Sequence, residues 1–501
     1  MDTTLRDGEQ TSGVSFSALE KLTVAKLLLE ELKVDRIEIA SARVSEGEFE
    51  AVKKITAWAK EVNCLEKVEI LTFVDKGVSL GWMEEAGAKV QNLLTKGSLN
   101  HLTHQLKQNP SEHFAQIAEI IAQAERKTIQ TNVYLEDWSN GMRTSPDYVY
   151  AYLDFLSTQP IKRVLLPDTL GVLTPTETNQ YLRAIIARYP DLHFDFHGHN
   201  DYDLGVSNAM EAVKAGVHGL HLTVNGMGER AGNAPLASVI AVINDFIPGV
   251  TTNLKEKALY QVSQLVATFT GFRIPANKPI VGANVFTQTA GIHADGDSKK
   301  NLYFNDLLPE RFGRKRSYAL GKTSGKANIV KNLQELGLTL NEEELKLVTQ
   351  RIIALGDKKQ KVTAYDLPYI ISDVLDSKSL NRNVIIKSYV LTHAKGLQPS
   401  TTVAIELEGE LIEENASGDG QYDAFLNAVR KIYKKKKRQL PQLIDYAVHI
   451  PPGSHSDALC ETTITWLKDE QEFITRGLDS DQTVSAIKAT EKMLNSTSLQ
   501  L

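Results

Sequence analysis

Short apolar segments of strand length alternate with longer amphipathic segments from the start of the chain to about residue 250. In the longer segments, apolar residues recur at helical spacing. The expected strands are DRIEIA (35–40), VEILTF (68–73), KVQNLL (89–94), TIQTNVY (128–134), RVLLPD (163–168), HFDFHGH (193–199) and GLHLTV (219–224). The expected helices lie at 17–32, 112–127, 176–190 and 206–217. Because strands that are joined through helices pair in parallel, the alternation restricts this region to an α/β fold.

A (β/α)8 TIM barrel accounts best for this alternation. A short stub before Arg6 counts as an eighth strand, and eight strand–helix units over roughly 250 residues are typical of the barrel. A doubly wound open sheet is the alternative, although the glycine-rich turn expected after its first strand is missing. Barrel strands usually contain about five residues or more, so the stub is short. Either the first strand is short or Met1 is not the natural start, and we favour the second explanation.

A change of pattern after residue 250 indicates further domains. A single hydrophobic core stops growing near about 250 to 300 residues, and this chain has 501. We expect the barrel at 1–253, a mostly helical linker region with a long loop at 254–380, and an α+β domain at 381–501. Within the last region, 418–433 and 478–494 each place a helix after a strand pair and a polar turn, which predicts duplicated ββ(β)α units.

Composition narrows the class of protein. The net charge of -6 gives no general attraction to nucleic acid, and the basic run at 431–441 is better explained as a solvated helix end. Cys64 and Cys460 form no disulfide or metal pattern, which fits a reducing compartment. No apolar run approaches the roughly 20 residues of a membrane span, and the N-terminus lacks a signal-peptide pattern. We expect a cytoplasmic protein without nucleic-acid or membrane partners.

His197 and His199 are two residues apart on an expected strand, so their imidazoles project to the same face. On a barrel strand this face can be the interior. Two histidines and one carboxylate can hold a divalent cation and leave coordination positions open for a substrate. Asp7 is the carboxylate we expect, because the first and last strands become neighbours when the barrel closes. Alternatively, the two histidines are ordinary polar residues of a strand.

Further polar residues are expected at the carboxyl ends of the strands, where the catalytic residues of such barrels lie. The segment NGMGERAGNAP (225–235) places Asn233 near the cation, and its glycines permit close backbone approach, although glycine-rich turns are common. Arg6 could stabilise an oxyanion that develops beside a metal-bound carbonyl. Glu136 would lie on the same rim, whereas on its own it would be a solvated surface carboxylate.

Seven segments resemble, in order, those of the acyl-CoA-condensing DRE-TIM metalloenzymes, which include the 2-isopropylmalate, homocitrate and citramalate synthases. The segments are DTTLRDGEQ, NVYLEDWSNG, LPDTLGVLTP, FHGHNDYDLGVSNAMEAV, NGMGERAGNAPL, GIHADG and GDGQYDA, and they extend over nearly the whole chain. The resemblance implies a divalent ion, Mg²⁺, Mn²⁺ or Zn²⁺, which holds a 2-oxo acid while acetyl-CoA, the co-substrate, adds to it. Hydrolysis of the thioester follows.

The resemblance also implies roles for individual residues at the metal. Asp7, His197 and His199 resemble the metal ligands, and Asn233 lies close by. Arg6 resembles the residue that polarises the oxo group.

Other residues resemble those that contact the two substrates. Thr169 resembles a hydrogen-bond donor to the carboxylate of the oxo acid. Glu136 and His293 resemble the pair implicated in removing a proton from the acetyl methyl group, although His293 could also be an ordinary loop histidine. Tyr303 belongs to the same loop, which in this family reaches into the active site of a neighbouring subunit. The resemblance therefore implies at least a homodimer, with an active-site loop contributed by the linker region.

Three bulky residues are expected at strand ends facing the metal pocket, namely Leu71, Leu94 and Tyr134. They leave room for a methyl group rather than a branched chain, which favours pyruvate as the oxo acid and matches the resemblance to citramalate synthases. Alternatively, the three are barrel-core residues. A 2-isopropylmalate synthase, acting on 2-oxoisovalerate, remains open because a pocket loses only about 1 to 3 kcal/mol for a missing methylene.

The C-terminal domain resembles the feedback module of the same enzymes, which binds isoleucine in citramalate synthases and leucine in isopropylmalate synthases. The residues expected near this effector are Tyr422, Asp423, Leu443, Tyr446 and Ile450. An ordinary αβ core would also explain the apolar members.

Two other classes of protein are alternatives. A lyase that cleaves a hydroxyacyl-CoA would use the same metal, but such lyases are shorter and carry a cysteine in the loop that here reads GMGERAGNAP. A non-catalytic amino-acid sensor would not need every chemical position to be intact, as it is here.

Overall fold

The computed structural model describes residues 1–290, 302, 305–357, 362, 364–375, 384–449, 460–469 and 471–498. The chain divides into two compact units. The first contains Met1–Phe286 and Phe304–Arg316, and the second contains Thr287–Tyr303 and Ser317–Leu501.

The first unit is built on a sheet of seven parallel strands that follow one another in chain order. The strands are β1 (Ile37–Ser41), β2 (Val68–Phe73), β3 (Val90–Lys96), β4 (Gln130–Glu136), β5 (Arg163–Asp168), β6 (Phe194–Gly198) and β7 (Gly219–His221). A doubly wound sheet would require the strand order to reverse at a switch point. The consecutive order therefore excludes the open-sheet alternative and confirms the predicted barrel.

Residues Met1–Thr3 close the barrel between its two edge strands. Asp2 forms parallel bridges with both Ile37 and Leu222. On one side, the Asp2 amide donates to Arg36 O and the Glu38 amide donates to Asp2 O, both at 2.9 Å; on the other, the Thr3 amide donates to Leu222 O at 2.9 Å. The expected eighth strand thus exists, but it is reduced to a single bridging residue.

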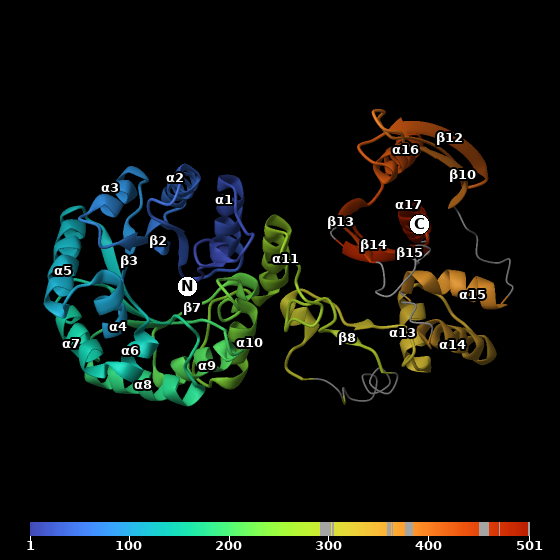
Figure 1. Cartoon of the computed structure of the whole chain (residues 1–501). Helices are drawn as coiled ribbons and strands as arrows, with labels where there is room; N and C mark the ends of the chain where they lie inside the picture. The colour runs from blue at the N-terminus through green and yellow to red at the C-terminus, as the bar shows by residue number, and fades with distance from the viewer. Residues whose placement is uncertain are drawn as a thin grey trace. The chain divides into compact units, whose positions relative to one another are not determined.

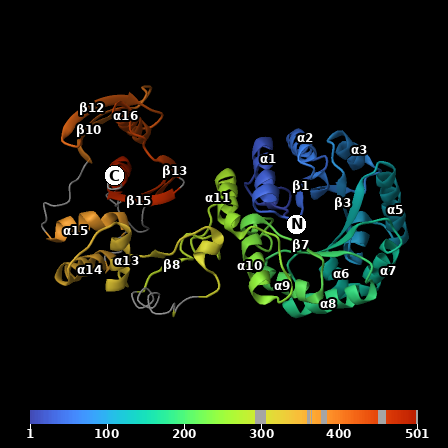
Figure 2. The same cartoon turned by 180° about the vertical axis from the view of Figure 1, so that it is seen from behind.

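Helices surround this sheet on the outside, as the ring of ribbons in Figures 1 and 2 shows. The α-helices are α1 (Ala18–Lys26), α2 (Glu46–Glu61), α3 (Val78–Glu85), α4 (Leu99–His101), α5 (Pro110–Arg126), α6 (Trp138–Thr144), α7 (Pro146–Leu156), α8 (Pro175–Arg188), α9 (Gly205–Ala215), α10 (Leu236–Phe246) and α11 (Leu259–Thr270). The π-helical turns are η2 (Leu27–Glu31) and η4 (Leu102–Leu106), and the 3-10 turns are η1 (Gly8–Gln10), η3 (Leu65–Lys67), η5 (Val224–Gly226), η6 (Glu256–Ala258) and η7 (Pro309–Phe312).

Local sequence explains where several of these helices begin. Ser17, Asn109 and Thr174 each cap a helix through a capping box, in which the cap side chain accepts from the third helical amide and a glutamate there accepts from the cap amide. In α5 the apolar residues at helical spacing, Ile117, Ile120, Ile121 and Ala124, are buried. They join the large core that lies between the sheet and the helices.

The second unit contains two βββα repeats, as the sequence predicts. The first repeat is β10 (Val384–Thr392), β11 (Ser400–Leu407), β12 (Glu410–Ser417) and α16 (Gln421–Lys435); the second is β13 (Gln442–His449), β14 (Cys460–Lys468), β15 (Gln471–Asp479) and α17 (Gln482–Ser498). Each sheet is antiparallel, and the two repeats share one apolar core.

The remainder of this unit is mostly helical. It consists of the short strands β8 (Thr287–Gln288) and β9 (Ser317–Tyr318), the helices α13 (Lys326–Glu335), α14 (Glu342–Asp357) and α15 (Leu367–Leu375), and the 3-10 turn η8 (Ala364–Asp366). The three helices enclose a separate small core that includes Ile329, Leu333, Val348 and Ile352.

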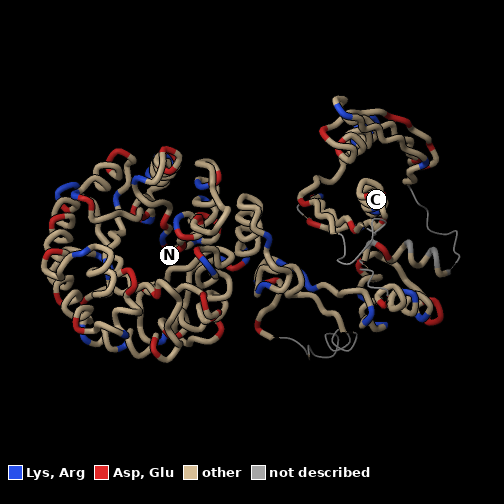
Figure 3. Tube along the Cα trace, in the orientation of Figure 1, with Lys and Arg blue, Asp and Glu red and all other residues tan. Residues whose placement is uncertain are grey.

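Acidic and basic residues are interspersed around the outer helices of the barrel (Figure 3). Within the described part of the chain, no helix combines the length and the apolar composition that crossing a membrane requires.

Candidate metal centre and active site

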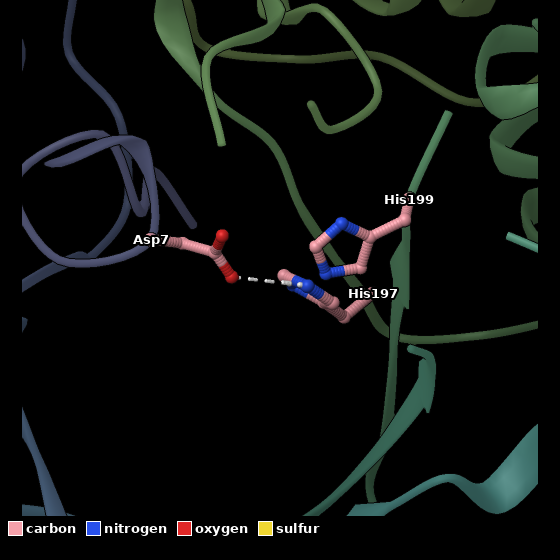
Figure 4. A group of neighbouring side chains, drawn as sticks. All are labelled: Asp7, His197 and His199. Atoms are coloured by element: carbon pink, nitrogen blue, oxygen red, sulfur yellow. Dashed lines mark ion pairs between the residues drawn. The ribbon is translucent and has the colours of Figure 1, made fainter. Parts of the chain in front are cut away.

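Asp7, His197 and His199 lie together at the carboxyl end of the barrel strands, although 190 positions separate Asp7 from His197 in the sequence (Figure 4). His197 is on β6, His199 directly follows it, and Asp7 lies in the turn after the bridging residue Asp2. Asp7 Oδ2 is 3.3 Å from His197 Nε2, and one ligand atom from each residue lies within 4.8 Å of the others. All three side chains are buried. The sequence prediction that these residues meet is confirmed.

The donor set fits a divalent cation. Two imidazoles and one carboxylate form the ligand set of metal sites that keep positions open, and metal–ligand bonds of about 2.0 to 2.2 Å bring their donor atoms about 3 to 4 Å apart. Asn233 donates through Nδ2 to Asp7 Oδ1 at 3.0 Å and to Met227 O at 2.9 Å. Its Oδ1 is buried and accepts no hydrogen bond from the described residues. A buried amide oxygen without a donor is an available ligand for a cation.

Arg6 holds the Asp7 carboxylate in its charged form. Arg6 Nη1 lies 3.0 Å from Asp7 Oδ2, and Arg6 Nε lies 2.5 Å from Glu38 Oε2. Burial would raise the pKa of Asp7, but the charge of Arg6 and the hydrogen bond from His197 outweigh it and hold this pKa well below its usual range. Asn92 Nδ2 donates to the second oxygen of Glu38 at 2.7 Å. The guanidinium is therefore fixed between two carboxylates beside the candidate metal site.

Burial also sets the protonation of the second imidazole. It lowers the pKa of His199 to about 4, so the ring is neutral near pH 7. A neutral imidazole is the form that coordinates a metal ion.

A buried lysine supports the turn that carries Arg6 and Asp7. Lys21 Nζ donates to Leu5 O at 2.9 Å and to Ile39 O at 3.1 Å, which ties this turn to β1. The same ammonium forms ion pairs with Glu9 at 2.6 Å and Glu48 at 2.5 Å. Because the lysine side chain is fully buried, these four acceptors replace its hydration.

The loop that carries Asn233 requires glycine at position 228. Gly228 has φ near +149°, and a Cβ placed there would lie 2.3 Å from Asn233 Nδ2 and 3.2 Å from Asp7 Oδ1. Any side chain at this position would displace the residues that surround the candidate metal site.

Glu136 lies at the end of β4, opposite Lys96 at the end of β3, and the two side chains form an ion pair. The next residue, Asp137, has a left-handed backbone with φ of 64°. Its amide donates to Thr169 Oγ1 at 2.9 Å, and its carboxylate accepts from Ser98 at 2.7 Å and from Asn140 at 2.8 Å. The Thr169 oxygen accepts this hydrogen bond, so the hydrogen of its hydroxyl group remains available to donate to a ligand.

The three predicted pocket residues do lie together. Leu71 and Tyr134 form a buried cluster with Leu165, and Leu94 packs against it. The Tyr134 ring meets the ring of His197 edge to face, with centroids 6.1 Å apart. This apolar cluster is therefore adjacent to the candidate metal ligands.

Three predicted residues, His293, Tyr303 and Ile450, lie outside the described residues. The remaining effector candidates are in the second unit. Tyr422 and Tyr446 have ring centroids 5.3 Å apart, and Leu443 and Tyr446 pack against the core of the two repeats. Asp423 accepts a hydrogen bond from the Asp419 amide at 3.0 Å.

Sequence reasoning missed several residues that shape the site: Lys21, Glu38, Lys96 and Leu165. For Glu38 a signal was present, because a carboxylate in the middle of the apolar run DRIEIA requires a buried partner. For Lys21, Lys96 and Leu165, the residues that they contact are decided by packing between segments that are distant in the sequence.

The fold and the site define a barrel enzyme with a candidate metal site at the carboxyl ends of its strands. A family model described as HMGL-like matches residues 1–266, one described as homocitrate synthase post-HMGL domain-like matches 280–360, and one described as LeuA allosteric (dimerisation) domain matches 361–498.

Curated relatives extend over the whole chain. The (R)-citramalate synthase CimA of Methanocaldococcus jannaschii is 32% identical and covers 99% of this chain and 98% of that protein. The 2-isopropylmalate synthase of the same organism is also 32% identical, covering 99% of this chain and 93% of that protein. A solved hydroxymethylglutaryl-CoA lyase of Pseudomonas aeruginosa is 17% identical, covers 55% of this chain and 93% of that one, and has a TM-score of 0.45. The chain belongs to the HMGL-like family and is a condensing acyltransferase of the DRE-TIM group.

Proposed function

We propose that the protein is an (R)-citramalate synthase, which condenses acetyl-CoA with pyruvate and then hydrolyses the thioester, in the biosynthesis of isoleucine. The observation that carries this choice is the bulky cluster of Leu71, Leu94, Tyr134 and Leu165 next to the candidate metal ligands. Such a cluster leaves space for the methyl group of pyruvate and opposes a branched side chain.

Asp7, His197 and His199 would hold the divalent ion, with Asn233 Oδ1 available beside them. The ion, which can be Mn²⁺, Mg²⁺ or Zn²⁺, supplies Lewis-acid polarisation of the oxo group when bound. Arg6 adds a fixed positive charge on the same side, and the Thr169 hydroxyl donates to the carboxylate of the oxo acid.

Carbon–carbon bond formation requires a base for the acetyl methyl group, which is a very weak acid. Glu136, assisted by His293, takes this proton, and the methylene carbon of the resulting enolate then bonds to C2 of pyruvate. The former oxo oxygen receives a proton and becomes the hydroxyl group of the product. Water then cleaves the thioester, which releases CoA as the free thiol. Tyr303 belongs to the loop that carries His293 and completes the proposed site, contributed from a second subunit of a homodimer.

The C-terminal unit would bind isoleucine as a feedback effector near Tyr422, Asp423, Leu443, Tyr446 and Ile450. The match of residues 361–498 to the LeuA allosteric (dimerisation) domain supports both an effector site and a homodimer. The contact between Tyr422 and Tyr446 joins the two repeats, so a ligand bound there would be in position to affect both.

A 2-isopropylmalate synthase with leucine as its effector is the second candidate, because relatives with that name are equally similar. Release of free CoA, followed with a thiol reagent, separates the two candidates. In the presence of a divalent metal, we expect faster release with acetyl-CoA and pyruvate than with 2-oxoisovalerate. Faster turnover of 2-oxoisovalerate would replace the first candidate by the second, and no release with either oxo acid would reject both.

A further inference from the structure

A chain of three buried side chains continues from the substrate pocket into the interior of the barrel. Tyr134 on β4 reaches across the barrel, and its hydroxyl lies 2.7 Å from His221 Nδ1 at the end of β7. His221 Nε2 lies 3.1 Å from Asp195 Oδ2 on β6. The exposures of the three residues are 3%, 1% and 0%. Neither His221 nor Asp195 has a role in the proposed reaction.

The charges around Asp195 fix the direction of every hydrogen bond in this chain. Arg36 Nη2 can only donate and lies 2.7 Å from Asp195 Oδ2, so this carboxylate oxygen is a hydrogen-bond acceptor. A neutral His221 must therefore carry its hydrogen on Nε2, which leaves Nδ1 as an acceptor. The remaining donor is the Tyr134 hydroxyl, whose hydrogen points at His221 and away from the pocket.

This arrangement restrains the ring of Tyr134 at both ends. Its hydroxyl is anchored to His221, while its face and edges contact Leu71, Leu165, the ring of His197 and the guanidinium of Arg6, which lies 5.8 Å from the ring centroid. A tyrosine ring has only two side-chain torsions, so one strong bond at its tip removes most of its freedom to move out of the pocket.

We propose that His221 and Asp195 are positioning residues that fix Tyr134 and thereby set the largest side chain that the pocket accepts on its 2-oxo acid. The proposal rests on the proposed function in one respect, because Tyr134 must line the oxo-acid pocket. Tyr134 forms the wall, His221 holds it, and Asp195 with Arg36 orients His221.

Three variants test this proposal. Tyr134→Phe removes the hydroxyl and keeps the ring. His221→Gln removes the imidazole Nδ1 that accepts from Tyr134, while its amide nitrogen can take the place of Nε2 as a donor to Asp195. His193→Gln is the matched control, since His193 Nε2 lies 2.9 Å from the other oxygen of Asp195, Oδ1, and His193 is not part of the chain that reaches Tyr134.

The readout is the ratio of kcat/KM for 2-oxobutyrate to that for pyruvate. We expect Tyr134→Phe and His221→Gln each to raise this ratio by about fivefold, mainly through KM of the oxo acid, because each releases the same wall. The double variant should exceed neither single variant, since both break one hydrogen bond. His193→Gln should stay within about twofold of the parent. An unchanged ratio in His221→Gln, or effects that add in the double variant, would overturn the proposal.

A spectroscopic measurement tests the hydrogen-bond chain without relying on catalysis. In protein labelled with ¹⁵N-histidine, we expect His221 to be the Nε2-protonated tautomer and its Nδ1 signal to move in Tyr134→Phe. A His221 protonated at Nδ1, or a signal that does not move, would overturn the proposal even if His221→Gln failed to fold. If the parent protein released no CoA while His221 behaved as expected, the proposed function would fail and the positioning of Tyr134 would stand.

Discussion

The barrel and the two C-terminal repeats differ in whether they bury charged side chains. The barrel buries Asp7, Lys21, Glu38, Glu69 and Asp195. In the repeats, within the described residues 384–449, 460–469 and 471–498, the buried polar side chains are uncharged, such as Thr475, Ser485 and Asn495.

Burying a charged side chain costs free energy unless the charge is paired. A fold therefore retains many buried charges only where their electrostatic fields serve a function. In the barrel, Asp7 and Glu38 pair with Arg6 at the site that would hold a metal ion and an oxo acid, and Lys21 supports the turn that carries Arg6 and Asp7. In the repeats an apolar core with hydroxyl and amide partners is sufficient to specify the fold. Changes to buried charges in the barrel should therefore have large effects, and similar changes in the repeats should have small ones.

The largest effect should follow the loss of a metal ligand. We expect Asp7→Ala or His199→Ala to reduce CoA release by more than about a thousandfold, because each removes one donor to the cation. Thermal unfolding should change little for His199→Ala, which leaves no charge without its partner, whereas Asp7→Ala also removes an ion-pair partner of the buried Arg6 and should lose some stability. The exposed His104→Ala serves as the control. Near-full turnover of either ligand variant in metal-stripped buffer would show that the three residues do not hold the ion.

The next effect concerns stability. Lys21→Met should lower the free energy of unfolding by about 3 kcal/mol, because Glu9 and Glu48 lose the ammonium between them. Lys436→Met in the repeats, where the pair with Glu410 is exposed, should cost less than about 1 kcal/mol. Urea unfolding of the two variants measures the difference. Equal losses would remove the contrast between the two regions.

A smaller effect is expected in the substrate pocket. Leu94→Ala should increase kcat/KM for 2-oxobutyrate relative to pyruvate by about tenfold. A hydrophobic pocket discriminates by about this factor between substrates that differ by one methylene group. Release of CoA with each oxo acid gives this ratio. An unchanged ratio would mean that Leu94 does not border the oxo acid.

A further effect should appear in the pH dependence of stability. Burial, and then the charge of Lys96, lowers the pKa of His113 to about 4, whereas an unfolded histidine titrates near about 6.5. The unfolded state therefore binds more protons between these values, and stability present above pH about 6.5 is lost as the pH falls toward 4.

Replacing His113 by phenylalanine should make this decline shallower, because the variant keeps an aromatic ring without a proton to bind. His393→Phe is the control in the repeats, where the histidine is exposed. Thermal unfolding at several pH values provides the comparison. Parallel curves for the parent and His113→Phe would contradict the assignment of a buried neutral ring.

Much of the fold could be predicted because apolar periodicity is a local signal. The seven strands and the helices α5, α8 and α9 agree with the predicted segments within a few residues at most ends. The pattern predicts an eighth strand before Arg6, but its reduction to the single bridging residue Asp2 could not be predicted, since one residue has no periodicity.

Only some of the contacts in the candidate site could be predicted from the sequence. The meeting of Asp7 with His197 and His199 followed from two general rules, the alternation of side chains along a strand and the adjacency of the first and last strands. Other contacts depend on which side chains are brought together by packing, and short-range sequence patterns do not predict them. These are the contacts of Lys21 and Lys96 and the chain from Tyr134 through His221 to Asp195. The assigned roles of His293 and Tyr303 remain predictions.

The left-handed backbone at Asp137 has a consequence for the neighbouring carboxylate. Its amide and carboxylate connect the loops that follow three successive strands, so Glu136 leaves its strand in one fixed direction. A conformation of this kind costs about 1 to 3 kcal/mol in a residue other than glycine. The chain bears this cost once, when it folds, and Glu136, the proposed proton acceptor, then needs little rearrangement during catalysis.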